Sequence, residues 1–241
     1  MKMHHYVKVS QHFEYQYQRS NLKAGEIMIH VDFSENYYNK LQNATQSAYF
    51  GYEQFLLYTV DVYDQEQDDV KCDSFVLIPP TTDHSRMTVF SLNTYLLQLL
   101  ARKMDINIVH FWSDGCAAQF RSKFCFEWMT KISLHVKLYW DYFESHHGKG
   151  AVDGIVGCVK SLIYGYVMAK KVVLKGQKHF AEYANSVVHR ISVMYVEEVN
   201  MQEKAESNPD SGTLKIHCVE RELHTNNNKL KFFLTSQEQR F

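Results

Sequence analysis

The chain has 241 residues, of which 45% are hydrophobic and 22% charged, with 10 Gly and 3 Pro, so disorder and collagen-like structure are excluded and a packed core is expected. The formal net charge is -1, no apolar run approaches the roughly 18 residues of a membrane span, and the opening segment has no secretory apolar region. The chain has five cysteines without any C-x-x-C pair, which argues against disulfides and thiolate zinc sites and for reduced thiols inside a cell: Cys72, Cys116, Cys125, Cys158 and Cys218.

The first part of the chain is predicted to form one helix followed by three strands. Apolar residues at near-helical spacing predict a helix within residues 1–24. The run 27–31 is rich in β-branched residues and predicts a buried strand, and residues 53–63 and 74–78 predict two more. Between these last two strands, the acid-rich DQEQDD predicts a solvated hairpin loop.

Helices and strands alternate in the part of the chain that follows. Leucines at helical spacing predict a helix over residues 85–103, and residues 106–112 predict the fourth strand. A second helix around Trp128, a fifth strand over residues 135–143 and a third helix opening at Asp153 complete the series. This order of elements is typical of the ribonuclease-H-like fold, an α/β fold whose mixed five-stranded sheet is flanked by helices.

We expect three regions along the chain. Residues 1–24 form an N-terminal helical segment, residues 25–185 a ribonuclease-H-like catalytic domain, and residues 186–241 a small β-rich C-terminal extension. The extension is expected to pack on the main domain without a core of its own. Its predicted strands cover residues 191–199, 213–219 and 230–234.

Three acidic residues fall at the strand ends and helix start of this layout. Asp32 ends the first strand, Asp114 ends the fourth, and Asp153 opens the third helix. Carboxylates that lie close together repel each other and raise each other's pKa unless a cation neutralises them. Two Mg²⁺ or Mn²⁺ ions about 4 Å apart suit such oxygen ligands and catalyse phosphodiester chemistry. Taken singly, each acid also fits an ordinary role at a strand end or as a helix cap.

Three sequence blocks resemble the catalytic blocks of DDE/D-type transposases from animal DNA transposons. They are VDFSENYY at 31–38, FWSDGCAAQFRSKF at 111–124 and SHHGKGAVDGIVGCVK at 145–160. The resemblance runs from about residue 25 to about residue 178 and implies that Asp32, Asp114 and Asp153 are the catalytic, metal-binding triad. The implied activity is two-metal-ion cleavage and transfer of strands at transposon ends.

Other residues in and beside these blocks are also candidates for the site. The third acid is Asp where many relatives have Glu, and Glu144 is therefore a rival to Asp153 as metal ligand. Glu35 and Asn36 are expected to orient Asp32 or, alternatively, to be surface groups at a strand end. His146 and His147 are expected to contact a substrate phosphate or to support the site or, alternatively, to be ordinary loop histidines. Four cations are expected to contact DNA: Lys149, Lys160, Arg121 and Lys123.

The expected partners are DNA, as transposon ends and target, and further copies of the chain, because related transposases usually act as dimers or larger assemblies. No membrane partner is expected, and the location is nuclear. Only 31 residues precede Asp32, which leaves no room there for a terminal-repeat-binding domain, so a fragment, a decayed copy or a domesticated protein is expected. Two alternatives to an active transposase stay open: a domesticated, catalytically silent derivative that binds DNA or protein, and a ribonuclease-H-like nuclease.

Overall fold

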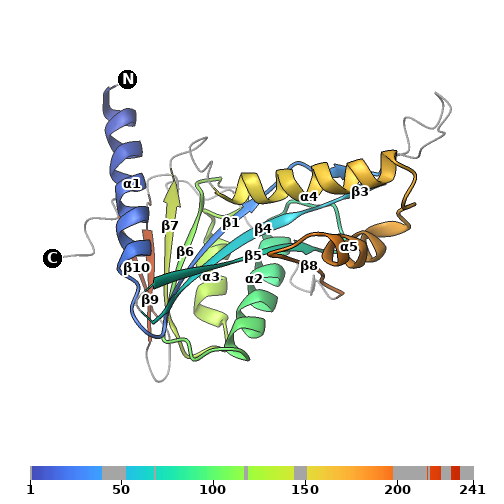
Figure 1. Ribbon diagram of the computed structural model, residues 1–241. Helices are drawn as coiled ribbons and strands as arrows, with labels where there is room; N and C mark the ends of the chain where they lie inside the picture. The colour runs from blue at the N-terminus through green and yellow to red at the C-terminus, as the bar shows by residue number, and fades with distance from the viewer. Residues whose placement is uncertain are drawn as a thin grey trace.

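Helices and strands alternate around one large sheet in the computed structural model (Figure 1). The structure describes residues 2–39, 53–67, 69–116, 119–143, 151–197, 216, 218–223 and 229–233. The helices of this part are α1 (Lys2–Ser20), α2 (Arg86–Ala101), α3 (Lys123–Lys131), α4 (Ala151–Met168) and α5 (Gly176–Val187). The strands are β1 (Glu26–Phe33), β2 (Tyr37–Tyr38), β3 (Gln54–Phe55), β4 (Tyr58–Glu66), β5 (Asp69–Ile78), β6 (Ile108–Asp114), β7 (Lys137–Phe143), β8 (Ile191–Tyr195), β9 (Cys218–Glu222) and β10 (Lys229–Phe233). The prediction of a mixed α/β fold is confirmed.

The large sheet contains eight strands of the described chain, in the order β10-β9-β7-β6-β1-β4-β5-β8. Strands β1, β4 and β5 form an antiparallel meander, while β6 pairs parallel to β1 and β7 pairs parallel to β6. Strand β8 adds parallel to β5 at one edge, and β9 and β10 add antiparallel beyond β7 at the other. The prediction of five strands is therefore wrong in number, because the strands near the C-terminus extend the sheet at both edges. Strands β2 and β3 form a separate small hairpin.

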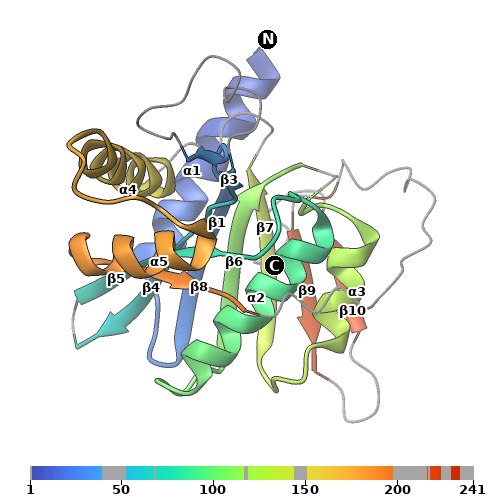
Figure 2. The ribbon, with the colours of Figure 1, turned by 90° about the vertical axis from the view of Figure 1, so that its right-hand side faces the viewer.

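Side-chain alternation along the strands divides the core between the two faces of the sheet. On β1, Ile27, Ile29 and Val31 belong to the cluster that packs under α2 and α3. Met28 points to the other face, where it packs with Tyr15 of α1. Figure 1 shows α4 on the opposite side of the sheet from α2 and α3, and Figure 2 shows the same layers from the side. The even-numbered residues of β1 therefore face α1 and α4.

Two local features differ from the sequence predictions. Strand β4 continues to Glu66 and β5 begins at Asp69, so most of the acid-rich DQEQDD is paired strand and the solvated loop shrinks to a tight turn. Gln67 makes this turn with a φ of 59°. Helix α5 was not predicted; it buries Phe180 and Ala184 against the α4 side of the sheet.

Helix α1 confirms the predicted N-terminal helix and lies against the strands rather than apart from them. The indole N–H of Trp112 donates to Gln18 over 2.8 Å, and the amide of Gln11 donates to the main-chain oxygen of Tyr142 over 2.9 Å. These two hydrogen bonds hold α1 against β6 and β7. None of the described helices combines the length and apolar character that a membrane crossing requires.

A buried histidine on β1 and a partly buried one on β6 predict that the protein loses stability in mild acid. Burial lowers the pKa of His110 to about 4, and its ring stacks on Tyr139 with centroids 5.0 Å apart. Burial lowers the pKa of His30 to about 4 as well. Because the unfolded chain takes up these protons near pH 6.5 and the folded chain does not, the free energy of unfolding falls as the pH drops from 6.5 to 4.

The variant His110→Phe keeps the stacked ring and removes one of these protons. At pH 5 we expect it to recover on the order of 2 kcal/mol relative to the parent, with little change at pH 8. Urea unfolding at both pH values measures this difference, and His189→Gln at an exposed position is the control. An equal pH dependence in His110→Phe and the parent would contradict the prediction.

Candidate active site

Asp32 and Asp114 lie at the carboxyl ends of two neighbouring parallel strands. The parallel pairing of β1 with β6 runs up to His30 opposite Trp112, and the two aspartates follow two residues later on each strand. Since side chains alternate along a strand, both carboxylates project on the face that carries α1 and α4. The structure thus brings together the first two residues of the predicted triad.

Helix α4 brings Asp153 to the same place. Its inner face is buried through Val152, Val156 and Val159, which fixes the helix on the sheet. Asp153 lies in the first turn of α4 and is exposed. Its charge acts on the carboxyl group of Asp32, so the two residues are close enough to interact electrostatically.

The electrostatics of Asp32 reflect this crowding. Burial, together with the negative charges of Asp114 and Asp153, raises the pKa of Asp32 to about 7. The main-chain N–H of Phe33 acts in the opposite direction by donating to the carboxylate. Asp114 is held by its own loop, because the N–H of Cys116 donates to its Oδ1 over 3.1 Å. A cation between these carboxylates would relieve the repulsion that raises the pKa.

The donor set is of the kind that hard divalent cations take. All three side chains offer carboxylate oxygens, and Mg²⁺ keeps several water ligands, so one or two protein carboxylates suffice to hold it. Among the residues that the structure describes, no three His, Cys, Asp or Glu side chains stand close enough to hold one ion by themselves. Four predicted site residues lie outside the described part of the chain: Glu144, His146, His147 and Lys149.

Arg121 is buried next to the strand ends instead of reaching toward solvent. Its side chain is only 4% exposed, its guanidinium lies over the ring of Tyr142 at 5.0 Å, and its Nη2 donates to the main-chain oxygen of Phe143 over 3.4 Å. Gly115, directly after Asp114, leaves the space for it. A Cβ at Gly115 would lie 2.7 Å from the guanidinium carbon and 2.9 Å from the oxygen of Phe143. Arg121 was predicted to contact DNA, and the structure gives it a buried place between the ends of β6 and β7.

The two remaining described cations lie in different settings. Lys123 is exposed at the start of α3, after the capping residue Ser122, whose hydroxyl accepts from the N–H of Cys125. Lys160 is half-buried on α4, and its ammonium donates to the main-chain oxygen of Glu35. Burial lowers the pKa of Lys160, and the charge of Glu35 opposes that change.

The segment after Asp32 carries the predicted Glu35 and Asn36. Glu35 is exposed, whereas the side chain of Asn36 contacts two other side chains. Its amide nitrogen donates to Gln54 over 3.1 Å, and its oxygen lies 2.8 Å from Nε2 of His84. Sequence reasoning missed His84, because this contact joins residues 48 positions apart and no motif marks it.

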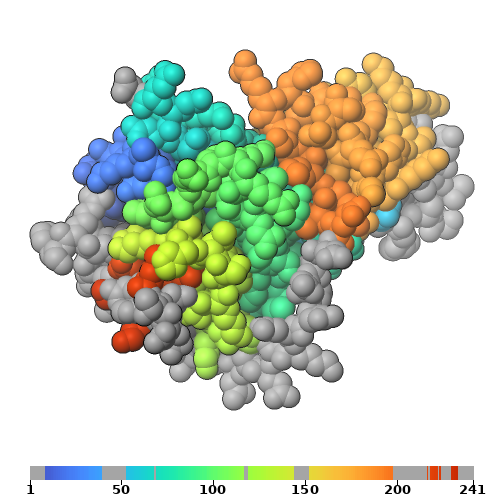
Figure 3. Space-filling view, turned by 90° about the horizontal axis from the view of Figure 1, so that it is seen from below, coloured from blue at the N-terminus to red at the C-terminus, as the bar shows by residue number. Residues whose placement is uncertain are grey.

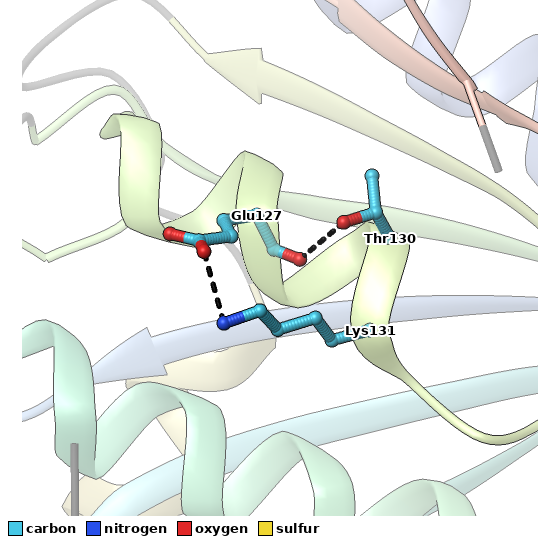
Figure 4. A network of polar contacts seen from close by, with 3 residues as sticks. All are labelled: Glu127, Thr130 and Lys131. Carbon is cyan, nitrogen blue, oxygen red and sulfur yellow. Dashed lines mark hydrogen bonds and ion pairs between the residues drawn. The ribbon is translucent and has the colours of Figure 1, made fainter. Parts of the chain in front are cut away.

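A pocket of about 860 Å³ lies on the other face of the sheet, away from the carboxylates. Phe90 of α2 and Trp128 of α3 line it, with Tyr195 at the end of β8. Figure 3 shows this face of the molecule. At its rim Lys131 pairs with Glu127 over 2.9 Å along α3, as drawn in Figure 4. This exposed ion pair contributes little to stability.

Fold and site together define an α/β protein with coupled carboxylates at the carboxyl ends of two parallel strands. The chain belongs to the family described as Domain of unknown function (DUF8701), whose model matches residues 10–229. No curated protein matches the chain, and no solved structure matches it either.

Proposed function

We propose that this chain is the ribonuclease-H-like catalytic core of a DNA transposase, which cuts and joins phosphodiester bonds with two divalent metal ions. The observation that carries the proposal is that Asp32 and Asp114 lie at the adjacent ends of two parallel strands, with Asp153 in the first turn of α4 close enough for its charge to act on Asp32. The central strand order β5-β4-β1-β6-β7, a meander followed by two parallel strands, supports the fold assignment. The similarity of the three sequence blocks to transposases supports the choice of DNA as substrate and a nuclear location.

In this function Asp32, Asp114 and Asp153 would hold the ions, with Glu144 as the rival third ligand. The ions would stabilise charge on the attacking and leaving oxygens of an in-line displacement. The side chains of the protein would bind the ions and orient the carboxylates. The strand pairing of β1 with β6 sets Asp32 beside Asp114, and the buried Arg121 joins the ends of β6 and β7 next to them. Lys123 is exposed and would contact phosphates as DNA approaches. A second chain would hold the second DNA end.

The test is cleavage of supercoiled plasmid DNA in Mn²⁺ by the parent protein and by Asp32→Asn and Asp114→Asn. We expect each variant to lose about 1000-fold in rate, or about 4 kcal/mol of transition-state stabilisation, because each removes a charge that holds the ions. Asp105→Asn is the matched control, since Asp105 is exposed and precedes β6 at the opposite end of the strand. Equal cleavage by the parent and both site variants would show that Asp32 and Asp114 are not catalytic metal ligands.

Two further comparisons separate the related possibilities. Asp153→Ala is expected to lose more activity than Glu144→Ala, and the reverse result would make Glu144 the third ligand. Joined DNA products support transposition, whereas cleavage of only the RNA strand of an RNA·DNA hybrid would point to a nuclease. Binding of Mn²⁺ and DNA without any cleavage would point to a catalytically silent derivative.

A further inference from the structure

The four residues that follow β1's Asp32 are held by contacts from three other parts of the chain. The ammonium of Lys160 on α4 donates to the main-chain oxygen of Glu35. Lys160 lies two turns along α4 from Asp153. The same helix therefore carries the predicted metal ligand Asp153 and bonds the segment that follows Asp32, the other predicted ligand. The position of Asp32 is thereby coupled to the position of Asp153.

The second contact to the segment after Asp32 comes from His84, which precedes α2. Nε2 of His84 lies 2.8 Å from the side-chain oxygen of Asn36, whose amide nitrogen donates to Gln54. Since the amide of Asn36 is used as a donor, its oxygen accepts, and Nε2 of His84 carries the proton. The His84 ring also packs on Phe33, with centroids 4.9 Å apart, and Phe33 adjoins Asp32.

These contacts lie at the end of β1, where the strand pairs with a neighbour on one side only. The pairing of β1 with β4 continues through Asp32 and Phe33, but its pairing with β6 ends at His30. Beyond His30, therefore, main-chain pairing to a neighbouring strand restrains the strand end only on the β4 side. The negative charges of Asp114 and Asp153 repel the Asp32 carboxylate and favour its moving away from them. Lys160 and His84 oppose such movement through Glu35, Asn36 and Phe33.

We propose that Lys160 and His84 are positioning residues, which hold the end of β1 so that the Asp32 carboxylate meets a divalent cation in a prepared orientation. The inference rests on the proposed function, and it gives Lys160 a task within the protein in place of the phosphate contact predicted from sequence. Groups that orient a metal ligand without touching the metal typically change its affinity by 10–100-fold. A phosphate contact would instead change the salt dependence of DNA binding.

The first experiment titrates Mn²⁺ into the DNA-free protein by calorimetry. Lys160→Met keeps most of the aliphatic side chain and removes the ammonium, and we expect the Mn²⁺ dissociation constant to rise about tenfold. Lys171→Met is the matched control, because Lys171 is exposed beyond the far end of α4. Parental Mn²⁺ affinity in Lys160→Met, together with a salt slope for DNA binding reduced by about 0.9, would overturn the positioning role in favour of a phosphate contact.

The second experiment uses two variants of His84 in the same titration. His84→Phe retains a ring against Phe33 and loses the bond to Asn36, so Mn²⁺ affinity is expected to fall about tenfold. His84→Gln restores a donor and is expected to return most of the affinity. If neither His84→Phe nor Lys160→Met differs from the parent, the inference is wrong. The variant Asp32→Asn distinguishes failure of the proposed metal site from failure of the positioning role alone. If Asp32→Asn binds Mn²⁺ like the parent, the proposed metal site is wrong, and the positioning role of Lys160 and His84 is wrong with it.

Discussion

Replacing Gly115 with alanine is expected to lower the free energy of unfolding by about 3 kcal/mol and to abolish cleavage. The new Cβ would lie 2.9 Å from the main-chain oxygen of Phe143 and 2.7 Å from the guanidinium carbon of Arg121. Arg121 is buried, so its side chain has little space into which it can withdraw. Displacing it would separate a buried charge from the Phe143 oxygen that accepts from it.

The effect of Gly115→Ala is measured by urea unfolding and compared with Gly157→Ala. Gly157 lies within α4, and a Cβ there meets no atom within 4 Å. The control substitution is therefore expected to stabilise the protein by up to about 1 kcal/mol through helix propensity. Opposite signs for the two variants support the packing argument. A Gly115→Ala protein as stable as the parent would show that the ends of β6 and β7 can rearrange freely around Arg121.

Asp32→Asn is expected to stabilise the metal-free protein at pH 8 on the order of 3 kcal/mol, although it removes cleavage. The carboxyl pKa of Asp32 rises from 3.8 to about 7 on folding, because the group is partly buried and lies near the charges of Asp114 and Asp153. At pH 8 the folded chain therefore holds a charge that costs free energy, and asparagine removes it. The raised pKa means that this cost grows as the pH rises from 3.8 to 7 and is complete above that range.

Thermal unfolding in a chelator and then in Mn²⁺ tests this prediction. In the chelator the variant should melt above the parent, and Mn²⁺ should raise the melting temperature of the parent much more than that of the variant. Asp105→Asn should stay within about 0.5 kcal/mol of the parent in both conditions, as exposed substitutions do. A variant less stable than the parent in chelator would show that the Asp32 carboxylate makes net favourable contacts in the metal-free fold.

Local sequence patterns determined most elements and the positions of the three acids within them. The β-branched run before Asp32 became β1, and the leucine-rich stretch after Ser85 became α2, because each pattern buries one strand or one helix face whatever surrounds it. Asp32 and Asp114 could be placed at strand ends from the sequence, since a strand's end is a local property. The order of the strands in the sheet follows less directly from the sequence. The alternation of helices and strands predicted this order only for the five central strands.

Only the tertiary structure decided the strand count, the role of Arg121 and the contacts of Lys160. Strands β8 and β9 join opposite edges of the sheet through main-chain hydrogen bonds, which leave no mark in the side-chain pattern. Arg121 and Lys160 look like solvated cations in the sequence, yet one is buried beside Gly115 and the other bonds Glu35, 125 residues away. A charged side chain has the same local signature whether it meets water, a ligand or a distant main-chain oxygen, so its partner becomes known only when the chain is folded.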